Sequence, residues 1–305
     1  MRYLVTGAAG FIGSNLADTL VASGHEVVGI DSFTDYYDPA EKEENARGLE
    51  VQRLDLADGP LELDGVDGVF HLAAQAGVRS FGDVFPVYAR RNLLATHRVF
   101  EAAAAAGVRV VFASSSSIYG EAESYPTRED AVPQPVSPYG ITKLACEHMA
   151  HAYARSFELD AVVLRYFTVY GPRQRPDMFF RRVCDALIAG SPFEIYGSGT
   201  QSRSFTEVGD VVAANIAAME QAPAASIFNV GGGEEASMLE AIAILERVSG
   251  RRLEVAHVDA AKGDVARTKA DVTRIQQALG WQPSTGLDQG LARMWSWASG
   301  RVAAG

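Results

Sequence analysis

MRYLVTGAAGFIG, residues 1–13, is an apolar strand that runs directly into a turn with glycines at positions 7, 10 and 13. Gly7 permits a tight turn at the strand end, Gly10 lets the backbone approach a ligand, and Gly13 lets the following helix pack close to the sheet. Free N–H groups and the positive end of the helix dipole then face the ligand's phosphates. Such turns also occur for purely structural reasons. The position of this one, between a strand and a helix, predicts a dinucleotide pyrophosphate site.

The second apolar run, residues 26–30, ends in Asp31. A carboxylate at the end of the second strand accepts hydrogen bonds from both hydroxyls of the adenosine ribose and repels a 2′-phosphate. The alternative is that Asp31 only caps a loop. With the glycines at the expected distance upstream, the pattern indicates NAD rather than NADP.

The composition is that of an ordinary globular protein, with 305 residues, 48% of them hydrophobic and 21% charged. A net charge of -11 without a long basic run argues against nucleic acid or an anionic membrane as a partner. The first apolar stretch lacks a charged leader and a cleavage site, and no window is long enough for a membrane span, so we expect a cytoplasmic protein. Cys146 and Cys184 lie in helical patterns without metal-ligand spacing, so neither a disulfide nor a metal site is expected.

Strand-like runs alternate with helical patterns through the first half of the chain. This alternation predicts an α/β fold, a Rossmann-type doubly wound parallel sheet that binds its ligands beyond the carboxyl ends of the strands. The expected strands are 26–30, 50–53, 68–72, 109–113 and 161–166, and the expected helices are 11–22, 87–106 and 138–157.

Beyond residue 166 the alternation gives way to a segment rich in Pro, Gly and Arg, residues 170–177, which indicates a change of domain. Two later runs, 205–219 and 227–230, are expected to return to the sheet. We therefore expect an NAD-binding domain of residues 1–166 plus about 205–230. The remainder, about 167–204 plus 231–305, is expected to form a smaller α/β substrate domain.

Tyr139 and Lys143 stand four residues apart at the start of a helix, and hence on one face. A free tyrosine has a pKa of about 10, but a neighbouring ammonium and a positively charged nicotinamide favour the phenolate, which can take a hydroxyl proton as hydride leaves the same carbon. Serines at 114–117 follow the strand 109–113 and can hold the reacting hydroxyl. A Tyr-x-x-x-Lys spacing occurs by chance and serines also cap loops, so the prediction depends on their combination.

Taken together, these motifs resemble the extended short-chain dehydrogenase/reductases of the nucleotide-sugar epimerase and dehydratase group, over essentially the whole chain. The matching pieces are TGAAGFIG at 6–13, Asp31, Asp55-Leu56, HLAAQAG at 71–77, Asn92, SSSSIYG at 114–120, YGITK at 139–143, RYFTVYGP at 165–172 and GTQSRSF at 199–205.

The resemblance implies bound NAD and assigns residues to it, while His71 receives no role and is expected to be a packed core histidine. Its implied catalytic residues are Tyr139, Lys143 and Ser115. Its implied cofactor-binding residues are Gly7, Gly10, Phe11, Ile12, Gly13, Asp31, Ser32, Asp55, Leu56, Leu72, Ala73, Ala74, Gln75, Asn92, Ser114, Tyr139, Lys143 and Tyr166.

Members of the group that dehydrate or decarboxylate sugars carry an acid where this chain has serines at 115–117, and a serine has no suitable pKa for that proton transfer. This favours 4-epimerisation. The stretch 165–178 resembles the UDP-glucuronate 4-epimerases, which implies that Thr168 and Arg175 hold a C6 carboxylate. The alternative is that Arg175 is a solvated loop residue. The implied substrate-binding residues are Ser116, Ser117, Thr168, Arg175, Arg203 and Asp264.

The sequence therefore predicts an NAD-dependent UDP-sugar 4-epimerase that converts UDP-glucuronate to UDP-galacturonate. Three alternatives stay open: a 4-epimerase of UDP-glucose or UDP-N-acetylglucosamine, a decarboxylase or dehydratase of the same group, and a non-catalytic NAD-binding regulator. Relatives are usually homodimers that pair two helices of each subunit, here 87–106 and 138–157, so we also expect a homodimer.

Overall fold

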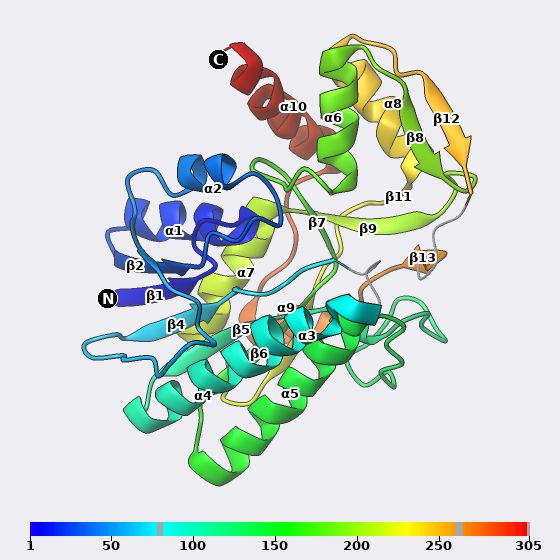
Figure 1. Ribbon diagram of the computed structural model, residues 1–305. Helices are drawn as coiled ribbons and strands as arrows, with labels where there is room; N and C mark the ends of the chain where they lie inside the picture. The colour runs from blue at the N-terminus through cyan, green and yellow to red at the C-terminus, as the bar shows by residue number, and fades with distance from the viewer. Residues whose placement is uncertain (78–81, 260–264, 304–305) are drawn as a thin grey trace.

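Seven parallel strands form the central sheet of the computed structural model, which describes residues 1–77, 82–259 and 265–303 (Figure 1). Their order is β10-β6-β5-β4-β1-β2-β3, so the chain reverses its direction of travel between β1 and β4. A crevice at such a reversal, beyond the carboxyl ends of the strands, is where an open parallel sheet binds ligands. The strands are β1 (Arg2–Thr6), β2 (Glu26–Asp31), β3 (Glu50–Arg53), β4 (Gly68–His71), β5 (Arg109–Ser115), β6 (Ala161–Tyr166) and β10 (Ile227–Val230).

Helices cover both faces of this sheet, which confirms the doubly wound α/β fold (Figure 1). One face packs against α1 (Phe11–Ala22), α7 (Val208–Gln221) and α9 (Thr273–Leu279). The other packs against α4 (Ala95–Ala106) and α5 (Pro138–Phe157). Because both faces are buried, the central strands read as nearly continuous apolar runs rather than as alternating ones.

The expected helix over residues 87–106 is present, but it contains a π-helical segment. The structure has a 3₁₀ turn at Gly82–Val84, the short helix α3 (Phe85–Tyr88), a π-helical segment at Ala89–Leu94, and only then α4. Asn92 lies in the π-helical segment with its side chain buried, where it hydrogen-bonds the loop after β4. Apolar periodicity alone does not reveal such a local widening, and π-helical turns are frequent near functional sites.

The rest of the chain builds a smaller α/β part with its own apolar core, formed by α6 (Phe179–Ala189), α8 (Met238–Ser249) and α10 (Leu287–Ala303) against short strands. Strand β9 ends at Glu207 in this smaller part, and the chain returns to the large sheet with α7 at Val208. Its four-stranded sheet is β11 (Glu235–Ser237), β9 (Ser202–Glu207) and β13 (Arg267–Thr268) with β7 (Thr168–Tyr170) beside β9, and its two-stranded sheet is β12 (Val255–Val258) and β8 (Phe193–Tyr196).

The two remaining short elements are α2 (Pro39–Asn45), which follows β2, and a 3₁₀ turn at Ser116–Ile118 after β5. Within the described ranges, no helix is both long enough and apolar enough to cross a membrane.

Candidate active site

The turn after β1 has no room for side chains. Gly7 has a φ of +71°, and a Cβ placed on it would lie 2.9 Å from the backbone nitrogen of Ala73. A Cβ on Gly13 would overlap the carbonyl oxygen of Gly7. The glycines therefore allow α1 to start close against β1 and the backbone to form the floor of a cavity, as the sequence predicts for a phosphate-binding turn.

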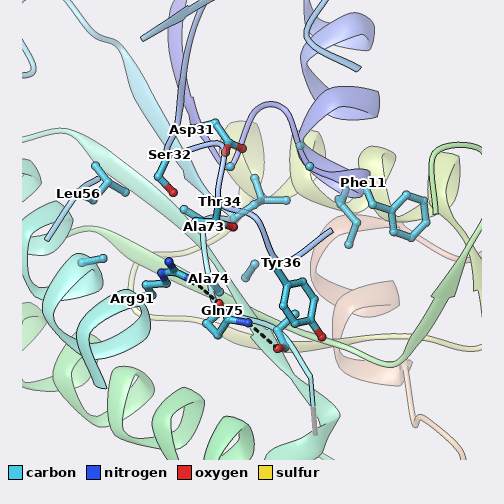
Figure 2. A pocket seen from close by; sticks show the side chains of 18 of the residues that line it. Phe11, Asp31, Ser32, Thr34, Tyr36, Leu56, Ala73, Ala74, Gln75 and Arg91 are labelled. Atoms are coloured by element: carbon cyan, nitrogen blue, oxygen red, sulfur yellow. Dashed lines mark hydrogen bonds between the residues drawn. The ribbon is translucent and has the colours of Figure 1, made fainter. Parts of the chain in front are cut away.

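The first cavity lies over this turn at the carboxyl ends of the strands and has a volume of about 210 Å³ (Figure 2). Every residue that the sequence assigned to the cofactor lines it, with the exception of Asn92. The first cavity therefore lies where the sequence predicts the cofactor.

Asp31 stands at the end of β2 on the rim of the first cavity (Figure 2). Its Oδ2 accepts a hydrogen bond from the backbone nitrogen of Ala9 at 3.1 Å, and its Oδ1 accepts one from that of Phe33 at 2.8 Å. The carboxylate is thereby fixed between the glycine turn and the loop after β2. This is the position from which the sequence predicts contact with a ribose.

Asn92 and His71 are buried near the first cavity but do not line it. The Oδ1 of Asn92 accepts a hydrogen bond from the backbone nitrogen of Gln75 at 2.7 Å, and its Nδ2 donates to Thr142 Oγ1 at 2.9 Å. His71 is a packed core histidine whose ring nitrogens hydrogen-bond Thr6 at 2.7 Å and Thr96 at 3.0 Å, and burial lowers its pKa to about 3. Asn92 thus holds the loop that follows β4, and His71 joins β4 to β1 and α4.

Tyr139 and Lys143 lie in the first turns of α5, a helix that Ser137 caps through a 3.1 Å hydrogen bond from the Gly140 backbone nitrogen to its Oγ. The Lys143 Nζ is buried, donates to the carbonyl oxygen of Ala113 at 2.7 Å and lies 5.8 Å from the centre of the Tyr139 ring. Burial lowers the pKa of Lys143 to about 8. The Lys143 side chain therefore stays mostly protonated at pH 7 and loses its charge as the pH rises through about 8.

Burial raises the pKa of Tyr139, whereas the positive charge of Arg175 and a hydrogen bond with Ser115 lower it. The sequence predicts that the Lys143 ammonium favours the phenolate. The structure adds a second cation, Arg175 of the segment after β7, which lines the same cavity and whose charge acts on the same phenol. Residue spacing could not reveal this charge interaction, because Tyr139 and Arg175 belong to different parts of the fold.

The second cavity adjoins the first and is lined mainly by the smaller part of the molecule. The two cavities share Tyr36, Ala76, Tyr139 and Arg175, so the phenol of Tyr139 stands at their junction. A ligand that fills the first cavity and one that fills the second therefore meet beside this phenol.

Of the residues assigned to the substrate, Thr168, Arg175 and Arg203 line the second cavity. Arg203 is largely buried and donates to the carbonyl oxygens of Ser202 at 2.8 Å and Val265 at 2.7 Å. The remaining substrate assignments fall elsewhere: Ser116 and Ser117, both within the described ranges, line neither cavity, and Asp264 lies outside those ranges. Ser115, which the sequence assigned to catalysis, also lines neither cavity, although it hydrogen-bonds Tyr139.

The model of the NAD dependent epimerase/dehydratase family matches residues 3–231. The chain belongs to this family. It is 40% identical over 303 residues to an uncharacterized UDP-glucose epimerase, YtcB, of Bacillus subtilis (strain 168), covering 95% of this chain and 96% of that one.

Solved structures of related enzymes superpose on the whole molecule. The UDP-glucuronic acid 4-epimerase from Bacillus cereus, in complex with UDP-glucuronic acid and NAD, is 38% identical with a TM-score of 0.95, covering 99% of this chain and 100% of that one. MoeE5 in complex with UDP-glucuronic acid and NAD is 44% identical with a TM-score of 0.89, covering 99% and 100% of the two chains. MoeE5 has also been solved with UDP-glucose and NAD.

NAD is the cofactor of this family, and the first cavity fits it. The glycine turn leaves backbone N–H groups and a helix N-terminus facing the cavity, and Asp31 stands at the end of the second strand. The cofactor prediction is thus confirmed, whereas the roles of the individual residues stay predictions.

Sequence reasoning missed several residues that line the first cavity, among them Tyr36, Lys42 and Arg91. The Arg91 Nη1 donates to Gln75 Oε1 at 2.7 Å (Figure 2), and the Lys42 Nζ donates to the Thr34 carbonyl oxygen at 2.6 Å. The available signal was the position of residues 32–42 directly after Asp31, because a loop that follows a strand of an open parallel sheet borders the ligand crevice.

Proposed function

We propose that the protein is an NAD-dependent 4-epimerase that converts UDP-glucuronate to UDP-galacturonate. The observation that carries the proposal is the position of Arg175, whose guanidinium lines both cavities beside Tyr139. A guanidinium there suits the C6 carboxylate of a sugar whose C4 hydroxyl faces the phenol, and Thr168 lines the same cavity. Two related structures carry UDP-glucuronic acid.

In this mechanism Tyr139, as the phenolate, accepts the proton of the C4 hydroxyl. When bound, NAD accepts the hydride of C4 and returns it to the opposite face after the 4-keto sugar has rotated. Tyr139 then gives its proton back to the C4 oxygen. Lys143 and Arg175 supply positive charge beside the phenolate, and Ser115 supplies a hydrogen bond to it.

Arg175 has a second role in the proposal. The 4-keto intermediate of a uronic acid is a β-keto acid, which loses CO₂ readily. A guanidinium bound to the carboxylate stabilises its charged form and opposes the loss of CO₂. Ser115, Ser116 and Ser117 occupy the place where dehydratases and decarboxylases of the group carry an acid, so those reactions lack their proton donor in this chain.

UDP-glucose is the second candidate substrate, and one contact favours it. Arg175 is already paired with Asp177, through bonds of 2.9 Å from Nε and 3.1 Å from Nη2. A neutral C6 hydroxymethyl group needs no free cation in the second cavity. YtcB is named as a UDP-glucose epimerase, and MoeE5 has been solved with either sugar nucleotide.

We also propose that the two parts of the molecule bind different ligands. The large sheet and its helices bind NAD, while the smaller part binds the UDP-sugar.

We further propose a homodimer that pairs the outer faces of α4 and α5 of the two subunits. Two apolar side chains are exposed in this region: Phe157 at the end of α5 is 62% exposed, and Leu94 just before α4 is 38% exposed. Sedimentation velocity tests this, since a Phe157→Glu variant that sediments like the wild type would contradict an interface at that face.

The substrate test incubates the purified protein with UDP-glucuronate and UDP-glucose separately, with and without added NAD, and resolves the products chromatographically. Formation of UDP-galacturonate without release of CO₂ supports the proposal. Turnover of UDP-glucose alone would retain the 4-epimerase mechanism but remove the carboxylate role of Arg175. Tyr139→Phe is the control, because a non-catalytic NAD-binding protein would be unaffected, whereas an epimerase loses nearly all turnover.

A further inference from the structure

The counter-ion of Arg175 is part of the second cavity. Asp177 lies two residues along the chain and takes the Nε and Nη2 edge of the guanidinium with both of its oxygens. The Arg175 side chain is 21% exposed and that of Asp177 is 40% exposed. Both residues line the second cavity, so the pair faces the same space as Thr168 and Tyr139.

Tyr36 joins this pair from the loop after β2. Its hydroxyl donates to Asp177 Oδ2 at 3.3 Å, and its ring centre lies 5.9 Å from the Arg175 Cζ. A Cβ on Gly77 would lie 2.9 Å from the Tyr36 hydroxyl oxygen, so the phenol is also packed against the loop after β4. Asp177 is therefore held from one side by Arg175 and from the other by a residue that lines both cavities.

This arrangement has an electrostatic consequence for an acidic sugar. Asp177 already neutralises Arg175 and occupies one of its two-nitrogen edges, and within the described part of the chain Nη1 makes no hydrogen bond. A substrate carboxylate would therefore share the guanidinium with a second carboxylate. Like charges brought together in a partly desolvated site repel, whereas a neutral hydroxymethyl group has no such cost.

We propose that Asp177 is a specificity-determining residue, whose carboxylate competes with the C6 carboxylate of a nucleotide sugar for Arg175, and that Tyr36 keeps Asp177 in place. This inference rests on the proposed function of the second cavity as the sugar site. Asp177 limits the preference for the acidic sugar, and this limit lets one site accept both acidic and neutral sugars.

Asp177→Asn tests the proposal, because the amide keeps an oxygen for Arg175 and loses only the charge. The NAD-loaded protein is titrated with UDP-glucuronate and with UDP-glucose by calorimetry. We expect the ratio of the UDP-glucose Kd to the UDP-glucuronate Kd to rise about tenfold, through tighter binding of UDP-glucuronate. Tyr36→Phe, which removes one hydrogen bond from Asp177, should change the ratio in the same direction by a smaller factor.

Asp130→Asn is the matched control. Asp130 pairs with Arg128 at the same spacing of two residues, at 3.1 Å, but this pair is exposed and lines neither cavity among the described residues. The control should leave both Kd values unchanged.

A second readout is the pH profile of the UDP-glucose reaction. Without the Asp177 charge, Arg175 acts more strongly on Tyr139, so the acidic limb moves to lower pH in Asp177→Asn. If Asp177 had a purely structural role, Asp177→Asn would weaken the binding of both sugar nucleotides equally and leave the acidic limb of the pH profile unchanged. An unchanged or reduced Kd ratio in Asp177→Asn, or wild-type protein that binds neither sugar, would overturn the proposal.

Failure of the proposed function is a separate result. It is seen as the absence of UDP-galacturonate from the wild-type reaction, whatever the Kd values of the two sugars.

Discussion

The ionisation of Tyr139 is set by residues from three places in the chain. Burial opposes the phenolate, while Arg175 and Ser115 favour it, and Lys143 lies 5.8 Å from the ring centre. The Lys143 ammonium is itself buried, donates a hydrogen bond to the Ala113 carbonyl and lies 4.8 Å from the centre of the Phe112 ring of β5. The charge on Lys143 is therefore conditional on pH in the range where the enzyme would work.

Lys143→Arg tests whether that charge controls the reaction. Burial lowers the pKa of Lys143 to about 8, so we expect kcat of the wild type to fall as pH rises through about 8 and the ammonium loses its proton. Arginine stays protonated, so the variant should keep its plateau to higher pH, even with a lower kcat. The measurement is kcat against pH with saturating sugar nucleotide. An alkaline limb at the same pH in both proteins would show that another group titrates there.

Among the elements, α5 connects this chemistry to the sheet. Tyr139, Lys143 and Glu147 follow one another at intervals of four residues, and hence on one face of the helix. Glu147 accepts hydrogen bonds from Arg165 of β6, at 2.7 Å from Nη2, and from the hydroxyl of Ser114 of β5. The side chains of Arg165 and Glu147 are only 6% and 4% exposed. The buried ion pair thus ties the helix that carries Tyr139 to two central strands.

Glu147→Gln should therefore be strongly destabilising. Removing one partner of a buried ion pair leaves an uncompensated charge and costs about 3–5 kcal/mol, which urea unfolding would detect. Glu101→Gln on α4 is the control, because Glu101 is 57% exposed and pairs loosely with Arg98 at 3.5 Å, so its loss should cost less than about 1 kcal/mol. Glu147 also raises the pKa of Lys143. Without its charge the pKa of Lys143 falls, so the alkaline limb of the kcat profile should move to lower pH in Glu147→Gln. Equal unfolding midpoints for the two variants would contradict this role.

On the scale of the whole molecule, the sequence predicted what depends on local patterns. The glycine spacing after β1 and the apolar runs of the central strands predicted the doubly wound sheet, the family and NAD, and these are confirmed. Contacts between segments that are distant in the sequence could not be predicted, because hydrophobic periodicity carries no information about them. Tyr36 and Asp177 are 141 residues apart, and the π-helical turn at Ala89–Leu94 interrupts an otherwise regular pattern.

The ion pairs that join the two parts of the molecule also could not be predicted from the sequence, because their residues are far apart in the chain. Glu41 of α2, beside the large sheet, binds two arginines of the smaller part: Arg181 of α6 at 3.0 Å and Arg301 of α10 at 3.0 Å. Burial raises the pKa of Glu41, but hydrogen bonds from both arginines outweigh it, so the pKa lies below its usual value. The Arg181 side chain is 8% exposed and that of Glu41 is 21% exposed. We infer that this cluster fixes the orientation of one part against the other.

Glu41→Gln should lower the free energy of unfolding at pH 7 by about 1–2 kcal/mol, a value discounted for solvent screening of the partly exposed group. Because the pKa of Glu41 is depressed in the folded protein, its contribution is present above the unfolded pKa of about 4.3 and is lost as pH falls through the folded value. Wild type and variant should therefore converge in urea unfolding at acidic pH. Glu44→Gln is the control on the same helix, since Glu44 is 59% exposed and its pair with Arg47 should contribute little. A Glu41→Gln effect no larger than that of Glu44→Gln would mean that apolar packing alone sets how the two parts meet.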